Sequence, residues 1–333
     1  MVVSPMYGPL PGSPGRITRR RLIASLAALP AAAALGGCSL VSDRPTGPLA
    51  DRIIGAAATT GMVGDLVANV GGARVESDAL MGAGVDPHLF KPSERTLRRM
   101  ERADIVFYNG LHLEAGLAYV LEQMEERQPV AAITRLIPED LLLTPAEFEG
   151  NPDPHIWFDV RLWILACAAV RDTLRELDPA NAATYDANAA AYTAELEALD
   201  AWVREQIATI PAERRVLITA HDAFGYFGQS YGFEVLGIQG ANTAAEAGAR
   251  DIQRLADLIA ERRIPAIFVE SSVPRRTVEA LREAVQSRGF DVRIGGQLYS
   301  DAMGDAGTPE GTYLGMVRAN VTLITTALSG EQT

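Results

Sequence analysis

The segment between residues 180 and 210 constrains the fold most, because its apolar side chains recur at steps of four and three residues. That spacing places them on one face of a helix. The face consists of Tyr185, Ala189, Tyr192, Leu196, Leu199, Val203 and Ile207. At 1.5 Å per residue such a helix is about 45 Å long, which is enough to run along two small domains. The dipeptide Asp178-Pro179 ends the preceding helix and allows this one to begin.

Strand and helix patterns alternate on both sides of this segment. Strands are predicted over 52–59, 73–82, 104–110, 215–220, 233–238, 266–271 and 291–296. Helices are predicted over 60–71, 92–103, 158–174, 223–231, 251–263 and 276–287. This alternation is typical of parallel sheets covered by helices. The sequence therefore predicts an α/β protein with an N-terminal lobe over 50–178, a linking helix over 179–211 and a C-terminal lobe over 212–330.

The N-terminus has the order of a bacterial export signal. The basic stretch "RITRRR" at 16–21 precedes an apolar run that is too short to span a bilayer comfortably. The run ends in "LGGC" at 35–38, which resembles the lipobox of lipoproteins, and "TRRRLI" at 18–23 resembles a twin-arginine signal. We expect residues 1–37 to be removed and 38–49 to form a tether. Acylated Cys38 would then anchor the protein to membrane lipid, on the extracytoplasmic side of the bacterial cell membrane.

Charge and cysteine content narrow the function further. The net charge of −12 argues against nucleic acid as a partner, because phosphate binding needs a basic face. Besides Cys38 the chain has one other cysteine, Cys167, which lies in an apolar run. With Cys38 acylated no internal disulfide can form, so we expect Cys167 to be a buried small hydrophobic residue.

Three of the four histidines lie at the ends of predicted elements. His88 follows the strand 73–82, His155 precedes the helix 158–174, and His221 follows the strand 215–220. Ligand sites of α/β folds lie at the carboxyl ends of strands, so three histidines in such loops indicate a metal site. The fourth, His112, lies in a helix-start pattern and is interpreted as an ordinary polar residue.

Proline and acidic residues surround these histidines. The tripeptide Asp-Pro-His occurs at both 86–88 and 153–155, and proline restricts the backbone before each imidazole. The candidate acceptors for the outer ring N–H groups are Asp86, Asp153, Asp159 and Asp222. The fourth ligand should be a carboxylate from the C-terminal lobe. Asp301, in the loop after 291–296, is the first candidate, and Glu270, at the end of 266–271, is its rival.

Several segments resemble, in order, the signatures of the cluster A-I metal-binding proteins, the substrate-binding lipoproteins of zinc and manganese ABC transporters. They are "GVDPHLFKPSERTLRRMERADIVFYNGLHLE", "DPHIWFDVRLW", "LITAHDAFGYFGQSYGFEVLGI", "IFVESSVPRRTVEAL" and "IGGQLYSDAMG". The resemblance implies two Rossmann-like α/β lobes joined by one rigid helix, with one metal ion in the cleft between them. The family's four ligand positions match His88, His155, His221 and Asp301. The resemblance also implies a monomer that is not an enzyme and whose partners are an ABC permease and its ATPase.

The ligand set favours zinc without excluding manganese or iron. Three imidazoles and one carboxylate suit tetrahedral Zn²⁺, whereas a bidentate Asp301 would bring the oxygen donors that Mn²⁺ prefers. Manganese-preferring relatives often carry glutamate at the position of His221. Zinc-dedicated members often have a histidine-rich loop between the first two ligands. This chain departs from them, because residues 112–154 contain no histidine other than His112. The stretch "TAAEAGARD" also lacks the Glu-Pro-Ser of many relatives.

Other functions remain open at this point. A zinc hydrolase would need an open coordination position and a general base, and the chain has no H-E-x-x-H motif. A binder of organic ligands would need aromatic platforms, but only three tryptophans are available. A metal-dependent surface adhesin is compatible with transport.

For a transport protein with two ligands on each lobe, we expect that separating the lobes leaves half a coordination shell.

Overall fold

The computed structural model describes residues 47–145, 148, 150–240, 242–244 and 248–329. The predicted signal peptide 1–37, Cys38 and the tether up to residue 46 lie outside these residues. No helix in the described part combines the length and the apolar character that crossing a membrane requires.

Four parallel strands form the sheet of the N-terminal lobe, by which we mean the elements that precede the long helix. They are β1 (Ile54–Ala58), β2 (Val75–Ala79), β3 (Ile105–Tyr108) and β4 (Val130–Ala132), in the spatial order β2-β1-β3-β4. Ile54 lies beside Val75 and Ala56 beside Ile105. Because the strands are parallel, their carboxyl ends meet at one edge of the sheet.

Helices α1 (Gly61–Gly71), α2 (Glu94–Arg102) and α3 (Ala118–Glu125) belong to this lobe. The hydroxyl of Thr60 accepts a hydrogen bond from the N–H of Val63 and so caps α1. Ser93 and Thr96 form a reciprocal capping box at the start of α2. The helices predicted over 60–71 and 92–103 are confirmed, whereas α3 and β4 were not predicted.

The C-terminal lobe contains two pairs of parallel strands. Strand β5 (Val216–His221) pairs with β6 (Glu234–Gln239), and β7 (Ala266–Glu270) pairs with β8 (Arg293–Leu298). Strand β5 lies against β7, but the two pairs do not join into one hydrogen-bonded sheet. The helices of this lobe are α6 (Gly225–Tyr231), α7 (Ala249–Arg262), α8 (Arg276–Gln286) and α9 (Tyr313–Leu328).

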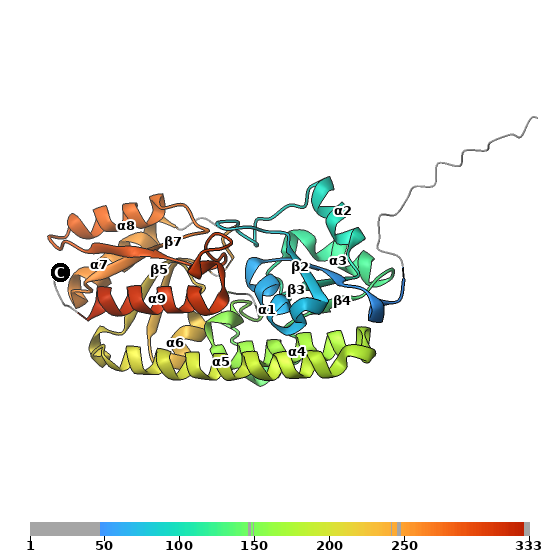
Figure 1. The fold of residues 1–333 in the computed structure, drawn as a ribbon. Helices are drawn as coiled ribbons and strands as arrows, with labels where there is room; N and C mark the ends of the chain where they lie inside the picture. The colour runs from blue at the N-terminus through green and yellow to red at the C-terminus, as the bar shows by residue number, and fades with distance from the viewer. Residues whose placement is uncertain (1–46, 146–147, 149, 241, 245–247, 330–333) are drawn as a thin grey trace, which may run out of the picture. The chain divides into compact units, whose positions relative to one another are not determined.

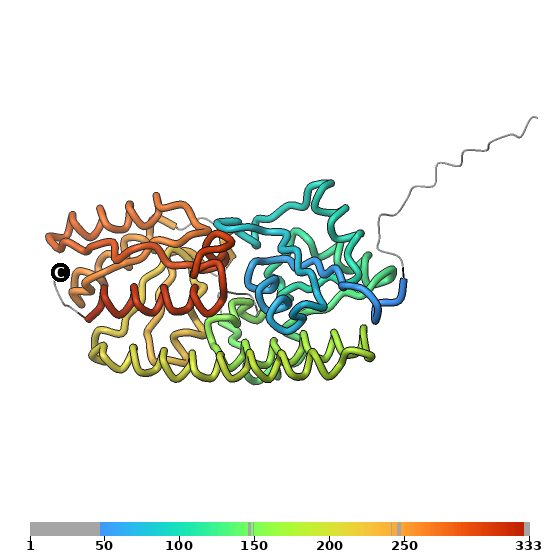
Figure 2. Tube along the Cα trace, viewed as in Figure 1, coloured from blue at the N-terminus to red at the C-terminus, as the bar shows by residue number. Residues whose placement is uncertain are grey.

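The long helix α5 (Ala182–Ala208) packs along α4 (Val160–Leu177) and also contacts α1 and α9 (Figure 1). Asp178 ends α4 and Pro179 begins the short turn that leads into α5, as predicted. The buried residues of α5 are the seven predicted from their spacing. At 1.5 Å per residue this helix is about 40 Å long. The path of the chain in Figure 2 shows it running below both lobes, so the prediction of two α/β lobes joined by one long helix is confirmed.

Short 3₁₀ helices complete the described part of the chain. They are η1 (Leu49–Asp51), η2 (Gly72–Arg74), η3 (Ala115–Leu117), η4 (Glu139–Leu141), η6 (Ile156–Phe158), η7 (Pro179–Asn181), η8 (Ala212–Arg214) and η9 (Pro309–Gly311). The described residues belong to one compact unit, so domain boundaries at 178 and 211 stay a prediction.

One hydrophobic core is shared between the lobes. Buried side chains of α1, α4, α5 and α9 belong to a single cluster, in which Trp163 of α4 stacks on Tyr313 of α9 with ring centroids 4.8 Å apart. Cys167 is fully buried in this cluster, as predicted, and burial raises the pKa of its thiol to about 11. This core therefore joins helices of both lobes by direct side-chain packing.

Candidate metal centre

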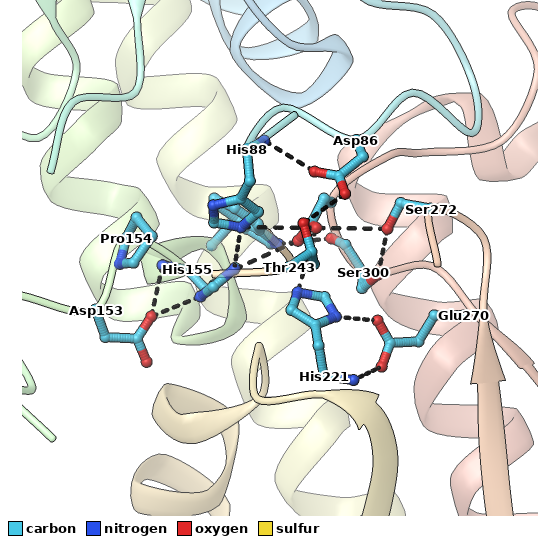
Figure 3. Close-up of polar contacts among 12 residues, drawn as sticks. Asp86, His88, Asp153, Pro154, His155, His221, Thr243, Glu270, Ser272 and Ser300 are labelled. Atoms are coloured by element: carbon cyan, nitrogen blue, oxygen red, sulfur yellow. Dashed lines mark hydrogen bonds and ion pairs between the residues drawn. The ribbon is translucent and has the colours of Figure 1, made fainter. Parts of the chain in front are cut away.

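The four side chains predicted as ligands come together between the two lobes. Figure 3 shows the three histidines of this group converging. His88 lies in the loop between β2 and α2, and His155 lies in the turn before η6. His221 is the last residue of β5, and Asp301 lies in the loop after β8. Each residue offers a potential ligand atom within 4.8 Å of the other three.

The distances between these atoms have the scale of a metal coordination shell. The Nε2 atoms of His88 and His155 are 3.2 Å apart. Asp301 lies 3.4 Å from His155 Nε2, 3.2 Å from His221 Nε2 and 3.8 Å from His88 Nε2. In a tetrahedron around zinc, ligand atoms about 2.0–2.1 Å from the ion lie about 3.3 Å from one another. The printed distances of 3.2–3.8 Å are close to this value, so the four side chains could hold one such ion after they draw together around it.

Asp153 holds the ring of His155 in position. Its Oδ1 atom lies 2.6 Å from His155 Nδ1 and also accepts the backbone N–H of His155 at 2.9 Å. A proton between Asp153 and Nδ1 leaves the lone pair of Nε2 free for a cation, since a neutral imidazole has one N–H. Both side chains are almost completely buried, so the ring has little freedom to turn.

Glu270 holds the ring of His221 in the same way from the opposite side. One carboxylate oxygen of Glu270 accepts the backbone N–H of His221 at 2.9 Å, and the other contacts His221 Nδ1. Figure 3 shows Asp153 and Glu270 on the outer sides of the two rings, while the inner nitrogens face each other. Glu270 is therefore the partner of a ligand candidate and not the rival ligand that the sequence suggested.

Asp301 faces the rings with both oxygens, Oδ1 toward His155 and Oδ2 toward His221 and His88. The hydroxyl of Ser272 donates a long hydrogen bond of 3.4 Å to Oδ2. Among the described residues, Asp301 Oδ1 and His221 Nε2 are buried without a hydrogen-bond partner. An unpaired buried polar group costs about 1–3 kcal/mol, so these two atoms point to a ligand between them.

His88 is held less firmly than the other two histidines. Asp86 Oδ1 accepts the backbone N–H of His88 at 2.8 Å, and Asp86 Oδ2 accepts the hydroxyl of Thr243 at 2.6 Å. Pro87 lies between Asp86 and His88 in the sequence, and its ring fixes φ there. Within the described part of the chain, the outer nitrogen Nδ1 of His88 has no carboxylate partner comparable to Asp153 or Glu270.

Neighbouring charges set the proton affinity of the cluster. Burial disfavours a charged His155, but the carboxylates of Asp153 and Asp301 outweigh it and raise the pKa to about 9. Acidic neighbours, Asp301 first, likewise overcome burial and raise the pKa of His221 well above its usual range. Burial opposes ionisation of Asp301, yet the two histidines lower its pKa well below the usual value. For His88 burial dominates and lowers the pKa to about 3.

Comparison with known proteins identifies the family. The model of the family described as zinc-uptake complex component A, periplasmic, matches residues 57–327. The chain belongs to this family. It is 50% identical over 273 residues to the zinc-binding protein TroA of Treponema pallidum, covering 81% of this chain and 87% of TroA. It is 45% identical over 295 residues to the manganese-binding lipoprotein MntA of Bacillus subtilis, covering 89% of this chain and 95% of MntA.

A solved structure agrees with this family assignment. The periplasmic zinc-binding protein TroA from Treponema pallidum superposes with a TM-score of 0.81 at 48% identity, covering 83% of this chain and 99% of that one. The family consists of metal-binding, substrate-binding proteins of ABC transporters and not of enzymes. The resemblance stated from the sequence motifs, the fold class and the expectation that the chain is not an enzyme are thus confirmed.

The remaining predicted side chains have other roles. Asp159 caps α4 through the N–H of Arg161 and accepts the hydroxyl of Ser230 at 2.6 Å. Asp86 contacts the backbone of His88 and not its ring, and the N–H of Asp222 donates to Gln239 O at 3.0 Å. Of the four predicted acceptors of ring N–H groups, Asp153 takes that position.

His112 is exposed and lies outside the cluster, as its interpretation as an ordinary polar residue requires. It lies in a turn with φ of 65°, in the left-handed region, and not at the start of a helix as expected. The first described 3₁₀ helix after it, η3, begins at Ala115.

Proposed function

We propose that this protein captures one divalent transition metal ion, preferably zinc, outside the cytoplasmic membrane and delivers it to an ABC permease. His88, His155, His221 and Asp301 would be its ligands. The observation that carries the proposal is the convergence of four potential ligand atoms within 4.8 Å, at a site that is mostly buried. Burial of this kind strengthens the attraction between the carboxylate and a cation.

Zinc is favoured because three imidazole nitrogens and one carboxylate are a donor set that Zn²⁺ prefers. The relative with 50% identity is named as a zinc-binding protein. Manganese is the second candidate because both oxygens of Asp301 face the rings, which would allow five donor atoms. The relative with 45% identity is named as a manganese-binding lipoprotein.

Transport requires partners and a place at the membrane. A substrate-binding component works with an ABC permease and its ATPase, and we propose that this chain does so as a monomer. Several relatives are named as lipoproteins, which supports acylation of Cys38 after removal of 1–37. A Cys38→Ser variant expressed in bacteria should then move from the membrane fraction to the soluble extracytoplasmic fraction. Retention of this variant on the membrane would exclude Cys38 as the anchor.

Metal titration tests the binding site. Purified, chelator-treated protein should take up one equivalent of zinc, and competition with manganese should show which ion it prefers. His155→Ala should abolish tight zinc binding and leave the circular dichroism spectrum unchanged. His112→Ala is the matched control, because it removes an exposed histidine outside the cluster and should keep wild-type affinity. Wild-type affinity in His155→Ala would remove this residue from the site.

A further inference from the structure

His155 belongs to the N-terminal lobe by its place in the sequence, but its turn is fastened to the C-terminal lobe. The hydroxyl of Tyr226, on α6, donates to the carbonyl of Asp153 at 2.9 Å. The hydroxyl of Tyr313, on α9, donates to the carbonyl of Trp157 at 2.7 Å. The indole N–H of Trp157 in turn donates to the carbonyl of Ser300 at 3.0 Å. These hydrogen bonds enclose His155 on both sides along the chain.

Side-chain packing also attaches this turn to the C-terminal lobe. The ring of Phe158, in η6, stacks on Phe224 of the C-terminal lobe with centroids 4.1 Å apart. Ser300, which accepts from Trp157, directly precedes the candidate ligand Asp301. On the side of the N-terminal lobe, the amide of Asn109 donates to the carbonyl of Pro154 at 3.0 Å, and the N–H of Asp153 donates to the carbonyl of Leu143 at 2.8 Å. The turn is thus tied to the C-terminal lobe by hydrogen bonds and ring stacking, and Trp157 ties it to the loop that carries Asp301.

The loop that carries His88 differs in each of these respects. Its neighbours Gly82, Ala83, Gly84 and Leu89 are exposed, and Leu89 has 52% of its surface accessible. The loop has no helix or strand between β2 and α2. Its hydrogen bond to the C-terminal lobe, among the residues described, runs from Thr243 to Asp86. In the described part of the chain, no carboxylate holds the outer nitrogen of this ring as Asp153 and Glu270 hold those of His155 and His221.

We infer that His155, His221 and Asp301 form a fixed three-ligand half of the site, and that His88 is the exchange ligand whose departure opens it. Tyr226 and Tyr313 are positioning residues that fasten His155 to this half. This inference rests on the proposed function. It replaces the expected division of two ligands per lobe, because separating the lobes would remove one ligand and leave three.

Zinc release measures the difference between fixed and exchanging ligands. His88→Ala should still bind one equivalent of zinc but release it to excess chelator about 10- to 100-fold faster than wild type. His155→Ala should hold no stoichiometric zinc under the same conditions. With Co²⁺ as a spectroscopic probe, His88→Ala should retain a one-equivalent visible absorption of altered shape, because a water replaces the imidazole.

The positioning residues need a control for the loss of a buried hydroxyl. Tyr185→Phe provides it, because Tyr185 is fully buried and its hydroxyl donates to Asp178 at 2.8 Å, on α5 away from the cluster. Tyr226→Phe, Tyr313→Phe and Tyr185→Phe should all lower the thermal midpoint to a similar extent. Only the first two should accelerate zinc release, by about 10-fold, as outer partners of a ligand do.

Two outcomes overturn the inference while leaving the proposed function intact. One is a His88→Ala variant that loses zinc as completely as His155→Ala. The other is zinc release from Tyr226→Phe and Tyr313→Phe at the rate of Tyr185→Phe. If the wild-type protein itself retains no metal, the proposed function fails first, and the inference fails with it.

Discussion

Replacing Glu270 by glutamine tests how much the outer hydrogen bond of one ligand contributes to metal affinity. Glu270 accepts two hydrogen bonds from His221, one from its backbone N–H at 2.9 Å and one from its ring Nδ1. Glutamine has one oxygen and one amide NH₂ in nearly the same volume, so it can satisfy only one of these donors. The substitution therefore changes the proton arrangement around His221 with little change in packing.

Two orientations of the glutamine have different consequences. If its oxygen keeps the backbone N–H, its NH₂ faces Nδ1 and forces the ring proton onto Nε2, the atom that faces Asp301. Metal binding at Nε2 must then leave the ring proton on Nδ1, opposite the NH₂ group, so that a buried donor has no acceptor, at about 1–3 kcal/mol. If the amide flips, the backbone N–H of His221 loses its partner in both the metal-free and the metal-bound protein, which lowers stability but not affinity. For the first orientation, which keeps the hydrogen bond to the backbone N–H, we expect zinc affinity to fall about 10- to 100-fold.

The assay is competition against a chromophoric chelator at fixed pH, with thermal unfolding measured on the same samples. Glu234→Gln is the matched control, because Glu234 pairs with Arg262 at the surface and lies outside the cluster. Its zinc affinity should equal that of the wild type. A Glu270→Gln protein with affinity within twofold of the wild type would refute the reasoning. The tautomer of His221 would then not depend on Glu270.

Three further predictions follow from the described residues. The pKa of His155 is raised to about 9 and that of His221 is raised well above its usual value, so both rings must lose a proton before they bind zinc at pH 7. Zinc affinity should therefore rise from pH 7 toward pH 9. Calorimetry in buffers of different ionisation enthalpy would count the released protons, and pH-independent affinity would contradict this prediction. Zinc at 1,000 times its dissociation constant should stabilise the protein by about 4 kcal/mol, and chelator should reverse the gain in thermal midpoint. Leu199→Ala, in the buried face of α5, should cost about 2–5 kcal/mol of unfolding free energy in urea and leave zinc stoichiometry at one, whereas a loss near zero would place Leu199 outside the core.

Local physical rules made the long helix and its neighbours predictable. The spacing of the apolar residues in α5 fits a helix with a single buried face, and the seven predicted residues are the buried ones. Asp178-Pro179 acts through the fixed φ of proline, and Ser93 acts through a hydroxyl that reaches the N–H of Thr96. Each of these signals depends on residues within four positions of one another. They needed no knowledge of the tertiary structure.

The candidate ligands could be predicted because each lies next to an element whose type was clear. His221 ends a fully buried strand, and parallel strands bring such ends to one edge. The partner of its ring could not be found this way. Glu270 lies 49 residues further along the chain, and its oxygens reach His221 because β5 lies against β7. A carboxylate at a strand end looks the same in the sequence whether it would bind the metal or the histidine.

Short elements without periodicity also escaped prediction. Strand β4 is three residues long, and all three are half-buried. Helix α3 is eight residues long. Neither element is long enough for a strand or helix pattern of apolar residues to repeat. Leu111 and His112 form a left-handed turn, a conformation that glycine favours. Since neither residue is glycine, the sequence gives no signal for this turn.

The sequence places His155 in the N-terminal lobe, but the hydrogen bonds of its turn reach the C-terminal lobe. This difference bears on how such a protein could release its metal. A boundary at residue 178 assigns the turn at 153–158 to the N-terminal lobe, yet Tyr226 and Tyr313 bind it to the other lobe. With α5 in contact with helices of both lobes, large hinge motions are disfavoured, so opening must come from a small displacement. Moving one loop, the one that carries His88, needs less rearrangement of the shared core than parting two pairs of ligands. A cation held by three fixed ligands and one exchanging ligand can be retained tightly and still leave through a single local step.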